Sequence, residues 1–143
     1  MNPKEYLLQI RLLNARIKNI ENSIERIREE EHEALQSSWP DGEPHGTKTG
    51  DPVAAKVIRL IDTLQRYENI LLGLKSELWH KKMEIIETIS GVPSAECNRI
   101  LYLRYVECKT WEEIAVDIGY TWRHTIRLHG DALKMVGEIL DKR

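Results

Sequence analysis

Residues 110–136 contain two helix starts on either side of a glycine, and this arrangement restricts the fold more than any other stretch of the chain. Thr110 is placed to cap a helix, and Glu113, three residues later, completes a capping box. Gly119 stands where that helix must end with a positive φ angle, which costs glycine nothing. Thr121 is then placed to cap a second helix. The stretch therefore predicts a short helix, a tight turn and a second helix.

The second of these helices has one inward side, because suitable residues recur along it at helical spacing. The inward positions are Thr125, Leu128, Ala132 and Leu133. Two helices joined by a glycine-bearing turn form the helix-turn-helix pattern, in which the second helix enters the major groove of DNA. We therefore expect the outward side of this helix to contact duplex DNA.

The outward side of the second helix supplies the candidate DNA-binding residues, which are Thr121, Trp122, Arg123, His124, Ile126, Arg127 and Lys134. A guanidinium group matches O6 and N7 of guanine, so Arg123 and Arg127 are expected to bind bases or phosphates. Thr121 and the free amides beside it are placed to bind a phosphate. Trp122 has two open interpretations: it contacts the DNA backbone or a thymine methyl group, or it folds onto the preceding helix.

Two long helices are predicted before this stretch. Apolar residues repeat at steps of three and four in residues 3–36, and again in residues 53–89, where Lys81 interrupts the pattern. Residues 37–52 lie between them and contain three prolines and three glycines, through which a helix does not continue. The two segments therefore predict an antiparallel, coiled-coil-like hairpin with a loop at 37–52.

The hairpin is expected to join copies of the chain. The apolar stripe of the second long helix is wider than one seam, which implies more than one packing neighbour. The residues expected to form the contact between copies are Ile10, Leu13, Ile17, Ile20, Ile24, Leu64, Leu71 and Leu78. The pattern leaves open whether the homo-oligomer is a dimer or larger. Two joined modules would bind DNA more tightly through avidity, and a dimer predicts an inverted-repeat operator.

A boundary is predicted near residue 90. Gly91 occupies the place of a helix C-cap and Pro93 follows shortly after, while Ser94 is placed to cap a new helix. Residues 1–90 are therefore expected to form the oligomerising hairpin, and residues 91–143 a three-helix module. The expected fold class is all-α: a long antiparallel helical hairpin followed by a C-terminal helix-turn-helix module.

The charge balance limits how the chain could bind nucleic acid. Its formal net charge is −2, so it is not a polycation that coats DNA indiscriminately. From Gly91 onward eight basic residues are balanced by eight acidic ones. Any contact with phosphates must therefore come from a local patch, and Arg123, Arg127 and Lys134 on the second helix predict one.

Other kinds of function have little support in the sequence. There is no glycine-rich phosphate loop, no G-x-S-x-G and no H-E-x-x-H, so we expect no enzyme, no small-molecule substrate and no cofactor. Cys97 and Cys108 lack C-x-x-C spacing and are expected to be free thiols, while His124 and His129 lack the spacing of a helical metal pair. No apolar run approaches the roughly 20 residues that span a bilayer. A cytoplasmic, nucleoid-associated protein of a bacterial host is expected.

The stretch from residue 100 to residue 136 resembles region four of bacterial sigma factors. The resemblance lies in Leu103-Arg104-Tyr105, Trp111-Glu112-Glu113-Ile114-Ala115, Gly119, Thr121 and Ala132-Leu133. Ile126 differs, because sigma factors often carry arginine at that place, so the contact chemistry there is not the same.

The layout of the whole chain is similar to small phage regulators of the ArpU and RinA type. The similarity lies in two long helices before the module, Asp51 after a polar break, and Gly119-Tyr120-Thr121 leading into Arg127-Leu128-His129. This resemblance implies a DNA-binding activator of phage or prophage late or packaging genes.

Three hypotheses of function follow. The first is a transcription regulator that binds a specific duplex site. The second is a DNA-packaging recognition protein like a small terminase subunit, which predicts a large closed ring. The third is a sigma-like adaptor that binds RNA polymerase and has no DNA affinity of its own.

Overall fold

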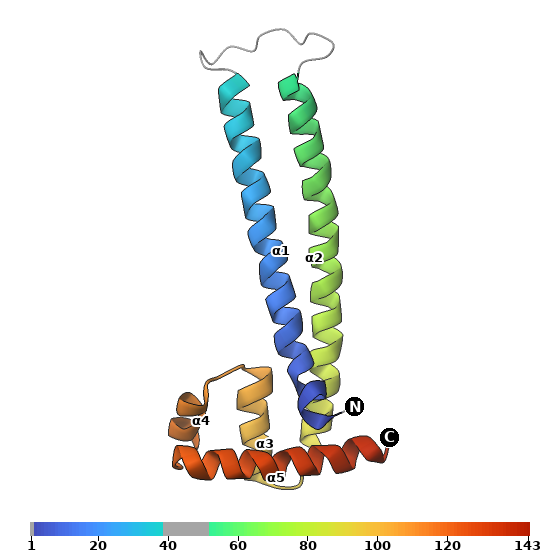
Figure 1. Ribbon diagram of the computed structural model, residues 1–143. Coiled ribbons are helices and arrows are strands. Elements are labelled where there is room, and N and C mark those ends of the chain that lie inside the picture. Colours follow the sequence, from blue (N-terminus) through green and yellow to red (C-terminus); the bar gives the residue numbers. More distant parts are fainter. Residues whose placement is uncertain (1, 39–51) are drawn as a thin grey trace. The chain divides into compact units, whose positions relative to one another are not determined.

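Every element that the structure describes is a helix, as the sequence predicts. The computed structural model describes residues 2–38 and 52–143, so most of the predicted loop at 37–52 lies outside the described residues. The elements are α1 (Pro3–Ser38), α2 (Pro52–Ser90), α3 (Ala95–Leu101), the π-helix η1 (Tyr102–Val106), α4 (Trp111–Ile118) and α5 (Trp122–Asp141) (Figure 1). Among these helices, none combines the length and hydrophobicity that crossing a membrane requires.

The chain divides into two compact units. Unit 1 consists of Met1–Asn14 and Ser76–Arg143, and unit 2 consists of Ala15–Lys75. The sequence pattern instead places a boundary at residue 90. Both long helices pass from one unit into the other, because the first turns of α1 and the last turns of α2 pack with the C-terminal helices.

Unit 2 is an antiparallel pair of helical segments from α1 and α2. Arg28 forms an ion pair with Glu68 at 2.9 Å, and Glu21 approaches Lys75 to 4.0 Å, so the residue order is reversed between the two helices. The side chains buried between the segments include Ile17, Ile24, Ala34 and Leu74. The pair is therefore stabilised by a narrow apolar seam with ion pairs beside it.

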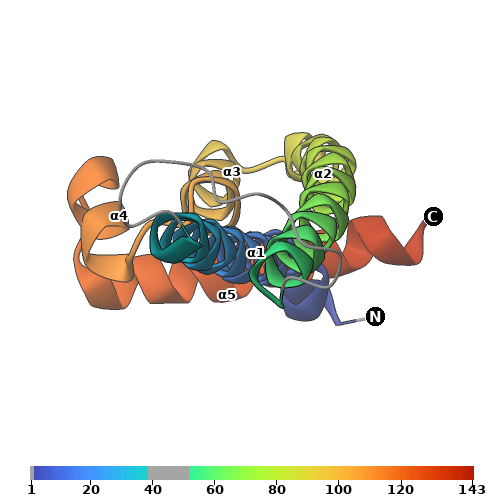
Figure 2. The same ribbon diagram turned by 90° about the horizontal axis from the view of Figure 1, so that it is seen from above.

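Unit 1 has a core to which five of the six elements contribute. Its buried side chains are Tyr6, Leu7 and Ile10 of α1, Ile85 and Ile89 of α2, Val92, Cys97 and Leu101 near or in α3, Tyr105 and Val106 of η1, and Ala132 and Val136 of α5. A second cluster, made of Ile100, Leu103 and Ile114, adds α4 to the unit. Figures 1 and 2 show α5 crossing α3, with α4 lying at the N-terminal end of α5. One continuous unit therefore holds the helix-turn-helix stretch.

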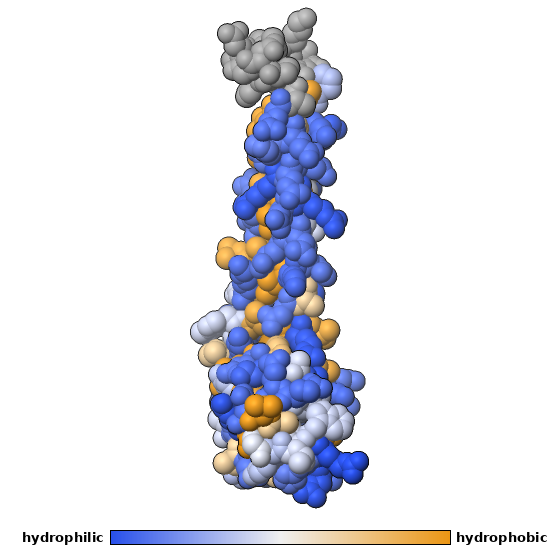
Figure 3. Space-filling view, turned by 90° about the vertical axis from the view of Figure 1, so that its left-hand side faces the viewer, coloured by the Kyte–Doolittle hydropathy of each residue, from blue (hydrophilic) through white to orange (hydrophobic). Residues whose placement is uncertain are grey.

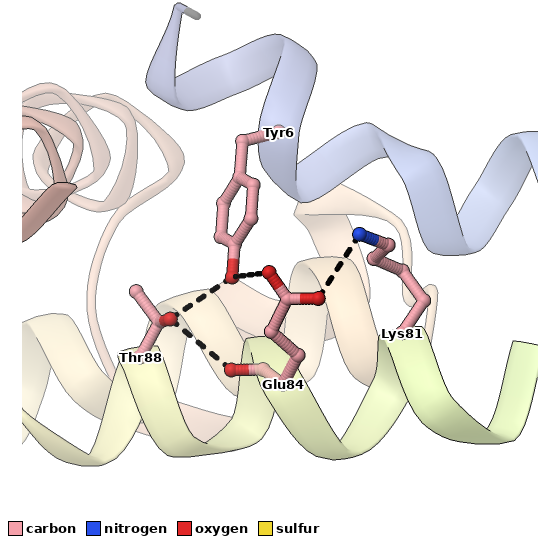
Figure 4. Close-up of polar contacts among 4 residues, drawn as sticks. All are labelled: Tyr6, Lys81, Glu84 and Thr88. Atoms are coloured by element: carbon pink, nitrogen blue, oxygen red, sulfur yellow. Dashed lines mark hydrogen bonds and ion pairs between the residues drawn. The ribbon is translucent and has the colours of Figure 1, made fainter. Parts of the chain in front are cut away.

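A polar cluster joins α1 to α2 inside unit 1 (Figure 4). The Tyr6 hydroxyl donates to Glu84 Oε1 at 3.2 Å and lies 3.0 Å from Thr88 Oγ1. Lys81 Nζ donates to Glu84 Oε2 at 3.0 Å, and this bond holds the pKa of Glu84 below its ordinary value. Lys81, which interrupts the heptad pattern, is thus accommodated by a neighbouring carboxylate.

Candidate nucleic-acid interface

The first helix of the candidate site, α4, begins as predicted. Thr110 has extended backbone angles, and its hydroxyl oxygen accepts a hydrogen bond from the Glu113 amide at 3.3 Å. The second half of the predicted capping box differs, because the Glu113 carboxylate accepts from the Thr110 hydroxyl at 3.2 Å. The cap fixes the start of α4 and thereby the position of the turn that follows it.

Gly119 ends α4 in the left-handed conformation that the sequence predicts, with a φ of 73°. Its amide donates to the Ala115 carbonyl at 3.0 Å, and the Tyr120 amide donates to the same carbonyl at 3.1 Å. Any other residue at this position would be strained by its Cβ atom. The Tyr120 hydroxyl donates to the Glu96 carboxylate, which ties the turn to α3.

The second helix, α5, also begins at the predicted cap. The Thr121 hydroxyl oxygen accepts from the His124 amide at 3.2 Å, and the Thr125 hydroxyl donates to the Thr121 carbonyl at 2.9 Å. Thr125 and Ala132 are fully buried, and Leu128 and Leu133 are half-buried. The predicted inward side of α5 is confirmed.

His129 is a further inward residue of α5, and it was not among the predicted inward positions. It is 8% exposed, and its Nε2 atom lies 2.7 Å from the Tyr105 hydroxyl. The Trp111 ring meets the imidazole edge-on, with 4.6 Å between ring centroids. The signal was present in the spacing, since position 129 follows Thr125 by four residues and precedes Ala132 by three. His129 therefore fixes α5 against η1 and α4.

The π-helical turn η1 places the partner of His129. The Glu107 amide donates to the Tyr102 carbonyl at 3.1 Å, five residues back instead of four. This wider turn brings Leu103, Tyr105 and Val106 all to buried positions. The spacing of a regular α-helix does not predict that Leu103, Tyr105 and Val106 are all buried.

The candidate DNA-binding residues lie on the outward side of α5 or at its start. Thr121, Trp122, Arg123, Arg127 and Lys134 are exposed, and His124 and Ile126 are half-buried. Trp122 is 54% exposed, so half of its surface is open to a ligand.

One of the candidate arginines is held in place. Arg127 Nη2 lies 2.9 Å from His124 Nδ1, and the Tyr120 ring meets the His124 ring edge-on at 4.8 Å. These contacts tie the Arg127 side chain to the turn at the start of α5. A positioned guanidinium loses less side-chain freedom when it binds a base or phosphate.

The basic residues of α5 form one row with a glycine between them. Arg123, Arg127, Gly130 and Lys134 follow one another at steps of four, three and four, so they share one side of the helix. A Cβ atom added at Gly130 would meet nothing within 4 Å. The fold does not require this glycine, and a glycine inside a helix costs about 1 kcal/mol relative to alanine. The backbone of α5 is therefore uncovered at Gly130 on this side.

The exposed surface of α4 is chemically different from that of α5. Val116 is 82% exposed, and Glu112, Glu113 and Asp117 are exposed around it. Lys109 Nζ donates to Asp117 at 2.8 Å, and this bond lowers the pKa of Asp117. Figure 3 looks from the side on which α4 lies in Figure 1, and it shows a small hydrophobic patch surrounded by hydrophilic residues. The exposed surface of α4 is therefore mostly acidic around one valine.

The residues predicted to join copies of the chain are mostly covered within one chain. Ile10, Leu13, Ile17 and Ile24 are buried, and Ile20, Leu64, Leu71 and Leu78 are half-buried. Ile10 belongs to the core of unit 1. Their contact with a second copy stays a prediction.

Acid is expected to destabilise unit 1 through His129. Burial, with smaller contributions from the charges of Lys4 and Arg104, lowers the pKa of His129 from 6.5 to about 4. Below pH 6.5 the unfolded chain binds a proton that the folded chain does not, so stability falls as the pH drops from about 6.5 towards about 4. The loss at this one group is roughly 2–3 kcal/mol. Denaturant unfolding at pH 7 and pH 4.5 measures it.

A His129→Gln variant separates this effect from the titration of carboxylates. Glutamine keeps a hydrogen-bonding side chain near Tyr105 but does not titrate. The variant should therefore lose less stability than the wild type between the two pH values, by the amount given above. An equal loss in both proteins would show that His129 does not titrate between them.

Comparison with protein-family models, with curated proteins and with solved structures finds no match to this chain. Within residues 2–38 and 52–143, no three His, Cys, Asp or Glu side chains are grouped so that they could hold a metal ion.

Proposed function

We propose that this chain binds a specific site in duplex DNA through the outward side of α5 and regulates transcription. The observation that supports this most is the row of Arg123, Arg127 and Lys134, which is exposed on the helix whose opposite side is buried. Guanidinium groups at the start of such a helix match the major-groove edge of guanine, and lysine neutralises phosphates. The acidic α4 surface leaves α5 as the side on which DNA binds.

The family resemblance supports the finer parts of this proposal. The chain resembles small phage regulators of the ArpU and RinA type, in which a long helical hairpin precedes a helix-turn-helix module. The resemblance implies a phage or prophage protein that activates late or packaging genes. A homo-oligomer would place two α5 helices on one operator, where successive half-sites are about 34–36 Å apart.

Selection of bound duplexes from a random-sequence pool, followed by affinity measurements at several salt concentrations, tests the proposal. We expect a recurring sequence to be enriched and to bind more tightly than a scrambled duplex. Affinity should fall steeply with salt, as it does when about three phosphates per chain are neutralised. Equal binding of selected and scrambled duplexes, or no binding at low salt, would contradict the proposal.

A second candidate function is favoured by Val116, whose exposure on an acidic surface suits a protein partner with apolar and basic groups. In this hypothesis the chain is an adaptor that docks on RNA polymerase. A Val116→Asp variant is then expected to bind bacterial RNA polymerase at least tenfold more weakly, because losing an apolar contact of this size costs roughly 1.4 kcal/mol or more. In this hypothesis neither the wild type nor the variant should bind duplex DNA measurably on its own. Unaltered polymerase binding in a pull-down or titration would exclude this surface.

A further inference from the structure

The hydrogen bond between Arg127 and His124 has a fixed direction. Arg127 Nη2 lies 2.9 Å from His124 Nδ1. Arginine has no acceptor atom, so the guanidinium donates and Nδ1 accepts. In this bond the imidazole is therefore neutral and carries its hydrogen on Nε2. His124 holds the arginine through a single acceptor atom.

His124 is itself held by the turn before α5. The Tyr120 ring meets the His124 ring edge-on with 4.8 Å between centroids, and the Tyr120 hydroxyl donates to Glu96 of α3. Tyr120 and His124 are half-buried, whereas Arg127 is exposed. A chain of contacts therefore runs from α3 through the turn to the Arg127 guanidinium. A side chain held in this way has less rotamer freedom to lose when a ligand binds.

The bond to His124 leaves Arg127 the donors that a guanine requires. A guanidinium has five N–H donors, and Nδ1 of His124 accepts one of the two on Nη2. Nη2 has a second hydrogen and Nη1 has two. These hydrogens form the planar fork that binds N7 and O6 of guanine. His124 therefore positions the fork without occupying it.

Arg123 has different surroundings. It is exposed, and within residues 2–38 and 52–143 no group forms a hydrogen bond or ion pair with its guanidinium. It lies in the first turn of α5, before the first helical hydrogen bond, from the Thr125 amide to the Thr121 carbonyl. Amides at the start of a helix favour an anion such as a backbone phosphate. A flexible cation beside them suits the same ligand.

We propose that Arg127 recognises a guanine in the bound site, that His124 is the positioning residue for this contact, and that Arg123 binds a backbone phosphate. The inference rests on the proposed binding of α5 to duplex DNA and assigns the source of its sequence preference. Phosphate contacts orient a protein on DNA, whereas contacts to base edges carry the sequence information. The two arginines therefore have different tasks.

Selected duplexes in which one guanine at a time is replaced by 7-deazaguanine test this assignment. The modified base pairs normally but lacks the N7 atom that the guanidinium fork binds. At one guanine of the selected site, the replacement should weaken binding by the full-length wild type roughly fivefold or more. Arg127→Ala should bind the natural and the modified duplex equally, because it has no fork to lose. Fluorescence anisotropy at fixed salt measures each affinity.

Arg123→Ala is the matched comparison. It removes the same side chain one turn earlier on α5 and should weaken binding to both duplexes by a similar factor. Its response to 7-deazaguanine should equal that of the wild type, and its affinity should depend less on salt, by about one phosphate contact. Loss of the 7-deazaguanine response in Arg123→Ala would overturn the division of tasks.

Two variants at His124 separate its acceptor atom from its ring. His124→Asn keeps an acceptor oxygen at the place of Nδ1, and His124→Phe keeps a ring beside Tyr120 but has no acceptor. Without the acceptor, Arg127 must be ordered when it binds guanine, so only the natural duplex is bound more weakly. The 7-deazaguanine response should therefore fall about threefold in His124→Phe and be retained in His124→Asn. A full response in His124→Phe, or its loss in His124→Asn, would overturn the role of the acceptor.

The outcomes distinguish this inference from the proposed function. A wild type that binds no duplex would overturn both. If the wild type prefers a selected sequence but responds to 7-deazaguanine at no position, or if Arg127→Ala keeps the response, the inference alone is overturned. Helix content by circular dichroism should be the same in all variants, since positions 123 and 127 are exposed and position 124 is half-buried.

Discussion

Replacing Arg123 and Arg127 together with alanine is expected to weaken binding to a selected duplex about a hundredfold. Each well-placed arginine contributes roughly 1–3 kcal/mol of binding free energy, and about 1.4 kcal/mol corresponds to a factor of ten. Both side chains are exposed, so the free energy of unfolding should change by less than about 0.5 kcal/mol for each. Fluorescence anisotropy with labelled duplex at fixed salt measures the affinity.

A matched variant removes the same charge from the other end of α5. Lys142→Ala with Arg143→Ala takes two positive charges from exposed positions about 28 Å along the helix direction from Arg123. This control should bind within a few-fold of the wild type. If both double variants lost affinity equally, the contact would be a general charge effect, and if neither did, α5 would not be the DNA-binding helix.

The second large effect is expected at Ile85, which is fully buried in the core of unit 1. An Ile85→Ala variant should lose about 2–5 kcal/mol of unfolding free energy, because it leaves a cavity among side chains from α1, α2, α3, η1 and α5. Although Ile85 belongs to α2, the amides of α5 should also lose protection from hydrogen exchange. Denaturant unfolding and exchange measured along the chain give both quantities.

Ile70→Ala is the comparison for this experiment. Ile70 lies on α2 as well, but it is 47% exposed and belongs to unit 2. Its replacement should cost less than about 1 kcal/mol and leave α5 protected. If Ile85→Ala exposed α2 while α5 kept its full protection, residues 91–143 would be a separate folding unit, as the position of Gly91 and Pro93 suggests.

Local signals predicted the helix caps, the turn and the inward side of the helix-turn-helix stretch. Thr110, Gly119 and Thr121 have the conformations expected of them, because caps and positive-φ turns depend on a few neighbouring residues. The inward side of α5 follows from helical spacing, and the all-helical fold follows from the heptad patterns. These features need no knowledge of distant contacts.

Features that depend on distant contacts could not be predicted. A heptad shows which side of a helix is apolar, but it does not show which neighbour covers that side. The ends of α1 and α2 therefore looked like parts of one hairpin, although Tyr6 and Ile85 share a core with α5. The inward position of His129 follows from its spacing on α5, but its partner Tyr105, which lies 24 residues away along the chain, could not be predicted.

The extra residue in the turn of η1 has a consequence for how this chain could vary. A five-residue turn shifts the angular phase of everything after it by about 100° relative to a regular helix. Leu101, Tyr105 and Val106 therefore face one cluster, while Ile100 and Leu103 face the other. Loss of one residue between positions 102 and 106 would rotate the side chains that follow the deletion relative to Ile100 and Leu101, which precede it. Homologous chains should accordingly keep the length of this segment even where its residues differ.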